Sequence, residues 1–361
     1  MKLLLSGGGT GGHIYPALAL AEGIKQELPN CQIRFVGAQG GMEEKIVPTA
    51  GYELKTLSIS GIDRSSPRKA LASLLRVPGA LRDARRLVRE FQPDVVVGTG
   101  GYASFPVVYA AARQGVPTAI HEQNAYPGIA NRILASRVDL VMITFTEARD
   151  RLKAKRVVVT GLPVREAVLQ AAKNKSAFHK SEKKNELTLL AFGGSQGAQV
   201  INQAIWEMTT WVPNEWRIIW VTGRQSYHHW QDKLKQKPGT KSTVEMHPYL
   251  DNIEQAMTVS DLAVCRAGAS TLAELTIMGL PAILIPFPLA AENHQEKNAR
   301  SLEAAGGARV IMNSELDGHR LMAEVESIQA HLPMMSNAMQ GQSAPEARDI
   351  MVKLVRELSQ H

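Results

Sequence analysis

The chain has 361 residues, of which 44% are hydrophobic and 21% are charged. This composition is typical of globular proteins with large cores and excludes an intrinsically disordered chain. One hydrophobic core rarely serves so long a chain, so we expect two domains of roughly 150 to 200 residues each. The net charge of +7 leaves a nucleic acid, an anionic membrane and an acidic substrate open as partners.

The N-terminal segment has a short apolar run, Leu3 to Leu5, before a run of glycines. That run is too short for the core of a signal peptide, and nowhere do about 18 apolar residues follow one another. We therefore expect neither secretion nor a membrane-spanning segment.

Cys31 and Cys265 are the two cysteines of the chain, and they form no metal-binding pattern. No two aspartates lie two residues apart, so the metal-chelating pattern of many nucleotide-sugar enzymes is absent. We therefore expect no disulfide, no bound metal and no cofactor.

Two glycine-rich turns, residues 7–13 (GGGTGGH) and 193–197 (GGSQG), each follow an apolar run and precede a helix-like stretch. Glycine permits a positive φ and lets a ligand approach the backbone closely. The helix that follows directs N–H groups and the positive end of its dipole at an anion. The pattern predicts one phosphate-binding strand–turn–helix unit built twice, with His13 of the first copy opposite Ala198 of the second.

Apolar runs alternate with helical stretches along both halves of the chain. Strand candidates lie near residues 2–5, 32–36, 94–97, 117–120 and 138–143, and then near 187–191, 217–221, 243–246, 262–265 and 282–285. This order predicts an α/β fold with two doubly wound parallel sheets. Residues 156–160 are strand-like, and Gly161, Leu162 and Pro163 after them break the pattern and are the predicted hinge. Residues 344–358 are typical of an amphipathic helix that could pack on either half.

Basic residues concentrate between Arg64 and Arg89, interleaved with leucines. We expect a short helix that ends at Pro78 and Gly79 and presents an apolar patch ringed by arginines to an anionic membrane. The alternative is a solvated helix that packs its leucines on its own sheet. Nucleic-acid binding is a weaker third option, because no aromatic residues lie among the arginines. The candidate membrane patch consists of Arg68, Lys69, Leu74, Leu75, Arg76, Leu81 and Arg82.

Both glycine turns also match other motifs. Residues 7–12 fit the G-x-G-x-x-G dinucleotide fingerprint, but the second strand candidate ends without the acid that would hold the ribose. Residues 193–197 fit the G-x-S-x-G elbow of α/β hydrolases. The similarity of this turn to the first one explains Ser195 better, since its hydroxyl would then bind a phosphate together with neighbouring backbone N–H groups.

Three further polar groups follow strand candidates, where doubly wound sheets bind ligands. Residues 121–124 (HEQN) are the first. Residues 269–274 begin a helix, and Thr271 with Glu274 either forms a capping box or leaves Glu274 to bind a ribose while the helix start holds a diphosphate. Gln295 and Asn298 share a helix face, and their amides suit sugar hydroxyls.

Seven blocks of the sequence occur in a characteristic order and spacing. They are residues 7–13 (GGGTGGH), 98–106 (GTGGYASFP), 121–124 (HEQN), 161–165 (GLPVR), 193–198 (GGSQGA), 265–274 (CRAGASTLAE) and 293–295 (NHQ). Together they resemble the MurG family of peptidoglycan synthesis, in glycosyltransferase family 28. The resemblance extends from residue 1 to about residue 310.

The resemblance implies the GT-B fold, in which two Rossmann-like domains face each other across a cleft. It implies an N-terminal acceptor and membrane-associating domain at residues 1–161, on which the C-terminal helix 344–361 packs back. Residues 162–343 would form the domain that binds UDP-N-acetylglucosamine (UDP-GlcNAc). The implied reaction is an inverting transfer of N-acetylglucosamine to undecaprenyl-diphospho-N-acetylmuramoyl-pentapeptide (lipid I), which gives lipid II.

The resemblance also implies a peripheral protein at the cytoplasmic face of the cell membrane. Its expected partners are the two substrates and the anionic surface of the inner leaflet, without nucleic acid. Protein partners from cell-wall synthesis are allowed as well.

Residue roles are carried over motif by motif. Within the donor site, Glu274 would bind the ribose, Gln295 the sugar, and Leu250 would contribute its backbone. The implied donor residues are Thr10, Gly11, Gly12, Asn124, Arg165, Ser195, Leu250, Ala269, Ser270, Thr271, Leu272, Ala273, Glu274 and Gln295. The implied acceptor residues are Gly9, Tyr102 and Asn131, together with His13 and Glu122, and the first glycine turn would hold the diphosphate of the acceptor. One departure is that residues 267–271 read AGAST where the family often has SGALT, which puts contact details in doubt.

In the inverting reaction a general base takes the proton of the attacking sugar hydroxyl. His13 is the first candidate, because an imidazole titrates near neutrality; Glu122 is the second. Alternatively, His13 donates a hydrogen bond to the acceptor diphosphate. Ser195, Ser270 and Thr271 would stabilise the leaving UDP. The rival functions are a UDP-GlcNAc 2-epimerase of the same architecture and a non-catalytic nucleotide-sugar binding protein.

Overall fold

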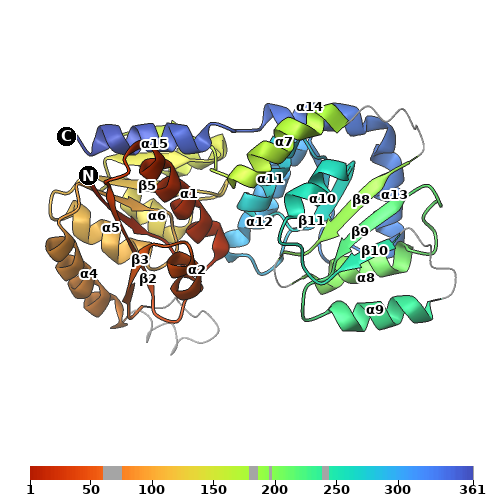
Figure 1. Cartoon of the computed structure of the whole chain (residues 1–361), viewed down its shortest axis with the longest axis horizontal. Coiled ribbons are helices and arrows are strands. Elements are labelled where there is room, and N and C mark those ends of the chain that lie inside the picture. The colour runs from red at the N-terminus through yellow and green to blue at the C-terminus, as the bar shows by residue number, and fades with distance from the viewer. Residues whose placement is uncertain (60–74, 179–185, 195–196, 238–243, 361) are drawn as a thin grey trace. The chain divides into compact units, whose positions relative to one another are not determined.

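The computed structural model describes residues 1–59, 75–178, 186–194, 197–237 and 244–360 (Figure 1). The chain divides into two compact units. Unit 1 consists of Met1–Val164 and Ala344–His361, and unit 2 consists of Arg165–Ser343. Each unit is an α/β structure built on one parallel sheet.

The sheet of unit 1 has seven parallel strands in the order β3-β2-β1-β4-β5-β6-β7. The strands are β1 Lys2–Ser6, β2 Gln32–Ala38, β3 Glu53–Leu57, β4 Val95–Gly98, β5 Thr118–Glu122, β6 Leu140–Ile143 and β7 Val157–Val159. β1 pairs with both β2 and β4, so the strand order reverses there. In doubly wound sheets, ligands bind beyond the carboxyl ends of the strands at this point.

Helices pack on both faces of this sheet. They are α1 Gly11–Glu27, α2 Glu43–Thr49, α4 Val77–Phe91, α5 Ser104–Ala112, α6 Ile129–Ala135, the 3-10 helix η1 Thr146–Arg151, and α15 Ala347–Leu358. Neighbouring strand residues point to opposite faces, so Leu3 and Leu5 pack with α1 and α15 in one core. Leu4 packs with α4, α5 and α6 in the other.

The C-terminal helix α15 is part of unit 1 and lies along α1 in Figure 1. Met351, Val352 and Val355 are buried there. The two helices approach closely at Gly23, where a methyl group would lie 2.7 Å from Cγ2 of Val352. A small residue at this position therefore allows α15 to dock.

Unit 2 has a six-stranded parallel sheet in the order β10-β9-β8-β11-β12-β13. Its strands are β8 Thr188–Phe192, β9 Arg217–Val221, β10 Val244–His247, β11 Leu262–Cys265, β12 Ala282–Leu284 and β13 Ala308–Val310. Its helices are α7 Glu166–Phe178, α8 Gln199–Met208, α9 Tyr227–Gln236, α10 Ile253–Val259, α11 Ala269–Met278, η2 Ala291–Asn293, α12 His294–Ala304, α13 Gly318–Ile328, η3 Gln329–His331 and α14 Leu332–Gly341. β8 pairs with both β9 and β11, so this sheet has the same switch point.

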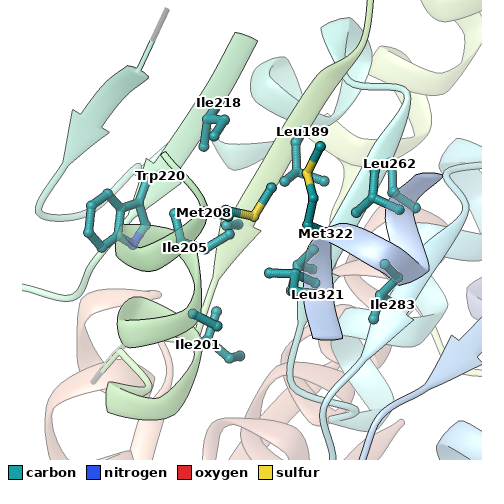
Figure 2. Packing of buried hydrophobic residues seen from close by; sticks show 14 of the residues in the cluster. Leu189, Ile201, Ile205, Met208, Ile218, Trp220, Leu262, Ile283, Leu321 and Met322 are labelled. Atoms are coloured by element: carbon teal, nitrogen blue, oxygen red, sulfur yellow. The ribbon is translucent and has the colours of Figure 1, made fainter. Parts of the chain in front are cut away.

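One core of unit 2 lies between α8, α13 and the sheet. Figure 2 shows Ile205 and Met208 of α8 and Met322 of α13 beside Leu189 and Ile218 of the strands. All of these side chains are buried. A buried polar contact joins β9 to α8, where the fully buried Trp220 donates its indole N–H to Asn202 Oδ1 at 2.9 Å.

The predicted fold class is confirmed, because both halves form doubly wound parallel sheets. The strands expected from the sequence did not include β3 and β13. Much of β3 is exposed, and β13 has three residues, so neither gives a strong apolar signal. The expected helix end at Pro78 and Gly79 is wrong, because α4 begins at Val77. Proline in the first turn of a helix loses no hydrogen bond, so it favours a helix start.

The two glycine turns are alike at their centres and differ at their ends. Gly9 and Gly194 occupy matching positions and have the same φ of 85°, a conformation that favours glycine. In unit 1, α1 begins at Gly11, so His13 lies in its first turn. In unit 2, Gly197 also has a positive φ and α8 begins at Gln199. The second copy thus has a longer turn and no counterpart of His13.

Candidate active-site residues of the two units

The first glycine turn holds a buried carboxylate. Glu43, at the start of α2, has no exposed surface and accepts the Gly9 N–H at 3.2 Å and the Ala38 N–H at 2.8 Å. The ring of Tyr102 lies against the turn, since a methyl group on Gly9 would lie 2.9 Å from its Cε1. The Gly9 amide, expected to bind the acceptor, is therefore occupied by Glu43. The N–H groups of Gly11 and Gly12 lie in the first turn of α1, where backbone N–H groups lack intrahelical partners and can bind an anion.

His13 is fixed at both its backbone and its ring by Thr99, which follows β4. The Thr99 hydroxyl donates to the His13 carbonyl at 2.7 Å. His13 Nδ1 lies 3.0 Å from the Thr99 carbonyl oxygen and 3.2 Å from Gln123 Oε1. The ring rests against Gly100, where a methyl group would come within 2.8 Å of Nδ1. These contacts place His13 at the carboxyl edge of the sheet, beside its switch point.

Glu122 lies at the end of β5 and is almost completely buried. Its Oε1 accepts the backbone N–H and the side-chain amide of Asn124, at 3.0 and 3.2 Å. Its Oε2 accepts the Gly128 N–H at 3.1 Å and the Asn131 amide at 2.8 Å. Four donors on one carboxylate are typical of an anchor for the loop between β5 and α6. Asn131 is itself buried and holds the loop in place through its hydrogen bond to Glu122.

The predicted donor residues Ala269 to Glu274 lie at the start of α11, next to the switch point of unit 2. The helix begins after Gly268, so Thr271 lies within the first turn rather than at the cap. The capping-box interpretation is therefore wrong. Among the described residues, the Ser270 hydroxyl is buried without a hydrogen-bond partner. Such a group is satisfied by a ligand or a water at many binding sites.

Ala269 and Leu272 of the same helix start are buried in the core of unit 2. They can therefore contribute backbone atoms to a ligand but not their side chains. Ala273 and Leu250, the latter after β10, are partly buried. Ser195 lies outside the described residues, so the structure gives no geometry for it or for the hydrolase elbow.

Arg165, Glu274 and Glu254 form an ion-pair cluster in unit 2. Arg165 Nε donates to Glu274 Oε1 at 3.0 Å, and its Nη1 lies 3.3 Å from Glu254 Oε2. Burial raises the pKa of Glu274, an effect that Arg165 opposes. Burial alone would lower the pKa of Arg165, but the carboxylates of Glu274 and Glu254 raise it. The cluster thus joins two predicted donor residues, Arg165 and Glu274, and pairs Arg165 with a second carboxylate, that of Glu254.

The two amides of α12 have different environments. Gln295 Oε1 accepts the Phe287 N–H at 2.9 Å, which ties α12 to the loop after β12. Asn298 is fully buried, and its amide lies 3.4 Å from the Ala267 carbonyl before α11. The expectation that Asn298 would contact a sugar is wrong, because its side chain packs inside unit 2.

The candidate membrane patch is described in part. Arg68, Lys69 and Leu74 lie outside the described residues. Leu75 is 72% exposed, and Arg76 and Arg82 are also exposed. Leu81, which begins the second turn of α4, is half-buried.

Four polar residues of these sites were not assigned a role from the sequence. Gln123 and His121 belong to the block at residues 121–124, but the contact of Gln123 with Thr99 requires β4 and β5 to be placed side by side, and that of His121 with Gly161 joins residues 40 positions apart. Glu43 and Glu254 lie in ordinary-looking helix starts, and no sequence signal marks them. Among the described residues, no three His, Cys, Asp or Glu side chains gather as a metal site would require.

Two doubly wound units with polar side chains at the carboxyl edges of their sheets define a two-unit, nucleotide-binding type of α/β protein. Residues 3–143 match the family model described as the glycosyltransferase family 28 N-terminal domain. Residues 188–354 match the glycosyltransferase family 28 C-terminal domain. The chain belongs to glycosyltransferase family 28 and is a hexosyltransferase, as its sequence motifs predict.

Two curated relatives match this chain over 99% of both lengths. The protein from Carboxydothermus hydrogenoformans is 45% identical over 371 residues. The protein from Halothermothrix orenii is 43% identical over 368 residues. Both are named UDP-N-acetylglucosamine--N-acetylmuramyl-(pentapeptide) pyrophosphoryl-undecaprenol N-acetylglucosamine transferase.

Solved structures agree on the architecture. The crystal structure of Acinetobacter baumannii MurG matches with a TM-score of 0.84 at 26% identity, over 99% of both chains. A UDP-GlcNAc 2-epimerase from Neisseria meningitidis, solved with UDP-GlcNAc bound, matches with a TM-score of 0.65 at 13% identity. It covers 99% of this chain and 100% of its own, and at that identity it shows a shared fold alone.

Proposed function

We propose that this chain transfers N-acetylglucosamine from UDP-GlcNAc to N-acetylmuramyl-(pentapeptide) pyrophosphoryl-undecaprenol, with inversion at the anomeric carbon. The observation that carries the proposal is full-length similarity, at 45% identity, to a transferase named for this reaction. In this proposal unit 1 binds the acceptor and unit 2 binds the donor. The N-acetylglucosaminyl group passes in a single displacement, and UDP leaves with the bonding electron pair.

The donor side of the proposal rests on the start of α11 and the ion-pair cluster. N–H groups at the helix start and the buried hydroxyl of Ser270 are donors for the diphosphate. Glu274 accepts the ribose hydroxyls, and Arg165 orients its carboxylate through their hydrogen bond and opposes the rise in its pKa that burial causes. Gln295 keeps its role as a contact for the sugar, held in place by the Phe287 N–H.

The acceptor side of the proposal assigns the base to His13 rather than Glu122. The carboxylate of Glu122 accepts four N–H donors, so taking up a proton would cost it those hydrogen bonds. His13 lies in the first turn of α1, beside Gly11 and Gly12. An acceptor diphosphate held by that helix start would bring its sugar near the imidazole.

UDP release from UDP-GlcNAc tests the transfer, measured with and without a soluble lipid I analogue. We expect UDP to be released only when the lipid I analogue is present. Release without any acceptor would instead indicate an epimerase or a hydrolase, and binding without turnover would indicate a nucleotide-sugar binding protein.

Two variants in the same assay test the base. His13→Gln is expected to lower kcat about 10² to 10⁴-fold with little change in thermal stability. Glu122→Gln replaces an acceptor oxygen with an NH₂ group facing two donors, so it should destabilise unit 1 by about 1–3 kcal/mol. The opposite pattern, an active His13→Gln and a stable but inactive Glu122→Gln, would assign the base to Glu122.

We further propose that the chain associates with the cytoplasmic face of the membrane through α4 and the residues before it. The described part of the chain contains no helix long and apolar enough to cross a bilayer. The exposed Leu75, Arg76 and Arg82 combine an apolar side chain with positive charge, which suits an anionic lipid surface. This location also brings the enzyme to an acceptor that carries an undecaprenyl chain.

A further inference from the structure

His13, Gln123 and His121 form a hydrogen-bonded series inside unit 1. His13 Nδ1 lies within hydrogen-bonding distance of the Thr99 carbonyl oxygen, at 3.0 Å, and of Gln123 Oε1, at 3.2 Å. A backbone carbonyl oxygen accepts hydrogen bonds and cannot donate them, so Nδ1 carries the ring proton. The lone pair of the neutral imidazole is then on Nε2.

The amide of Gln123 has one possible orientation. Its Nε2 lies 2.7 Å from the Thr99 carbonyl oxygen, 3.2 Å from the His121 carbonyl oxygen and 3.1 Å from His121 Nδ1. Two of these neighbours are carbonyl oxygens, so this end of the amide must be the NH₂ group. The oxygen of the amide therefore faces His13.

His121 supports that orientation from the other side. Its Nε2 lies 2.9 Å from the Gly161 carbonyl oxygen, so Nε2 carries the proton and Nδ1 accepts from Gln123. Burial lowers the pKa of His121 to about 4, so the ring is neutral near neutral pH and keeps this tautomer. The direction of every hydrogen bond from Gly161 to His13 is thus determined by carbonyl oxygens of the backbone.

We propose that Gln123, oriented by His121, is a positioning residue that holds His13 as the Nδ1–H tautomer with Nε2 as its proton-accepting atom. The inference rests on the proposed function, in which His13 is the general base. As the acceptor oxygen bonds to the anomeric carbon and the bond to UDP breaks, Nε2 takes the hydroxyl proton. Gln123 Oε1 and the Thr99 carbonyl accept from Nδ1–H and stabilise the imidazolium that forms, and the proton then passes to solvent.

The test compares Gln123→Met with Gln114→Met. Methionine keeps the length of the side chain but removes its amide. Gln114 provides a matched control, because its amide also donates to a backbone carbonyl oxygen, that of Ala110, at 3.1 Å. Gln114 follows the C-terminal end of α5, whereas His13 and Gln123 lie near the other end of this helix. We expect kcat of Gln123→Met to fall about tenfold or more relative to the control, as part of the general-base contribution. KM for both substrates should stay within about twofold, because Gln123 is buried.

A second readout observes His13 directly. In protein labelled with ¹⁵N-histidine, two-bond ¹H–¹⁵N correlations identify the protonated nitrogen, and the His13→Gln spectrum assigns the signal. We expect the wild-type ring to be protonated at Nδ1, with part of the population shifting to Nε2 in Gln123→Met. A wild-type ring protonated at Nε2 would overturn the inference without requiring any variant to fold.

The remaining outcomes separate this inference from the proposed function. If His13→Gln is inactive while Gln123→Met is as active as Gln114→Met, the positioning role alone is overturned. The same holds if kcat falls in Gln123→Met while the His13 signal stays unchanged. If His13→Gln retains full turnover, the base assignment and the positioning role are both overturned.

Discussion

Burial determines the charge of His121 and links it to the stability of unit 1. The side chain is fully buried at the end of β5, and burial lowers its pKa from 6.5 to about 4. The unfolded chain therefore takes up a proton on His121 at a higher pH than the folded chain does. Acid thus favours unfolding through this group, and the stability it contributes is lost as the pH falls from 6.5 towards 4.

A His121→Gln variant should remove this dependence, because glutamine does not titrate in this range. We expect the difference in unfolding free energy between wild type and variant to shrink by about 3 kcal/mol between about pH 7 and about pH 4. Urea unfolding followed by far-UV circular dichroism at several pH values measures it. A difference that stays constant with pH would mean that His121 takes up its proton at the same pH in the folded and in the unfolded chain.

Sequence motifs located the side chains of the candidate site but not their partners. His13 and Glu274 stand in recognisable blocks, so their positions could be predicted. The contact of His13 with Thr99, by contrast, joins residues 86 positions apart and depends on β1 and β4 pairing. Glu43 shows the same limit, because a buried glutamate inside a glycine turn leaves no pattern in the sequence.

Among the elements, α4 differs most between its two faces. Ala80, Ala84, Val88 and Phe91 are buried against the sheet. The opposite face carries five exposed arginines, which are Arg76, Arg82, Arg85, Arg86 and Arg89. One face of α4 therefore packs on its own sheet, as one alternative expected, while the other face is a basic surface suited to an anionic membrane.

Replacing two of these arginines tests the membrane proposal. Arg76→Ser with Arg82→Ser removes two positive charges, each of which is worth about 1 kcal/mol near an anionic surface. We expect sedimentation with phosphatidylglycerol-containing vesicles to weaken about thirtyfold, with UDP binding unchanged.

The matched control is Lys45→Ser with Lys353→Ser, which makes the same change in net charge at exposed positions on α2 and α15. Equal weakening in both double variants would mean that total charge, not the surface of α4, governs the binding.

Element boundaries were predictable where a special backbone conformation demands glycine. The positive φ of Gly9 and Gly194 follows from the aligned turns, and the strands before them have apolar centres. Pro78 was interpreted in the wrong direction, because proline is compatible both with the end of a helix and with the first turn of the next. The edge strand β3 was missed since its exposed residues resemble a loop.

On the scale of the whole molecule, the chain leaves unit 1 after Val164 and returns to it at Ala344. The apolar face of α15 could have matched either unit from its sequence alone, since amphipathic helices pack on any apolar surface. Its assignment to unit 1 comes from complementary shapes, such as Gly23 against Val352. Because both ends of the chain belong to unit 1, the stability of this unit depends on residues far apart in sequence.

A substitution in α15 should therefore destabilise unit 1 and leave unit 2 unchanged. Met351 is fully buried in the core with α1, and Met351→Ala should cost about 2–5 kcal/mol. All five tryptophans lie between residues 206 and 230, in unit 2, so their fluorescence reports the unfolding of that unit alone. We expect Met351→Ala to shift the urea transition seen by circular dichroism to lower concentration while the fluorescence transition stays in place. Ile205→Ala, in the core of unit 2, should move the fluorescence transition instead, and a joint shift of both signals in either variant would show that the two units unfold as one.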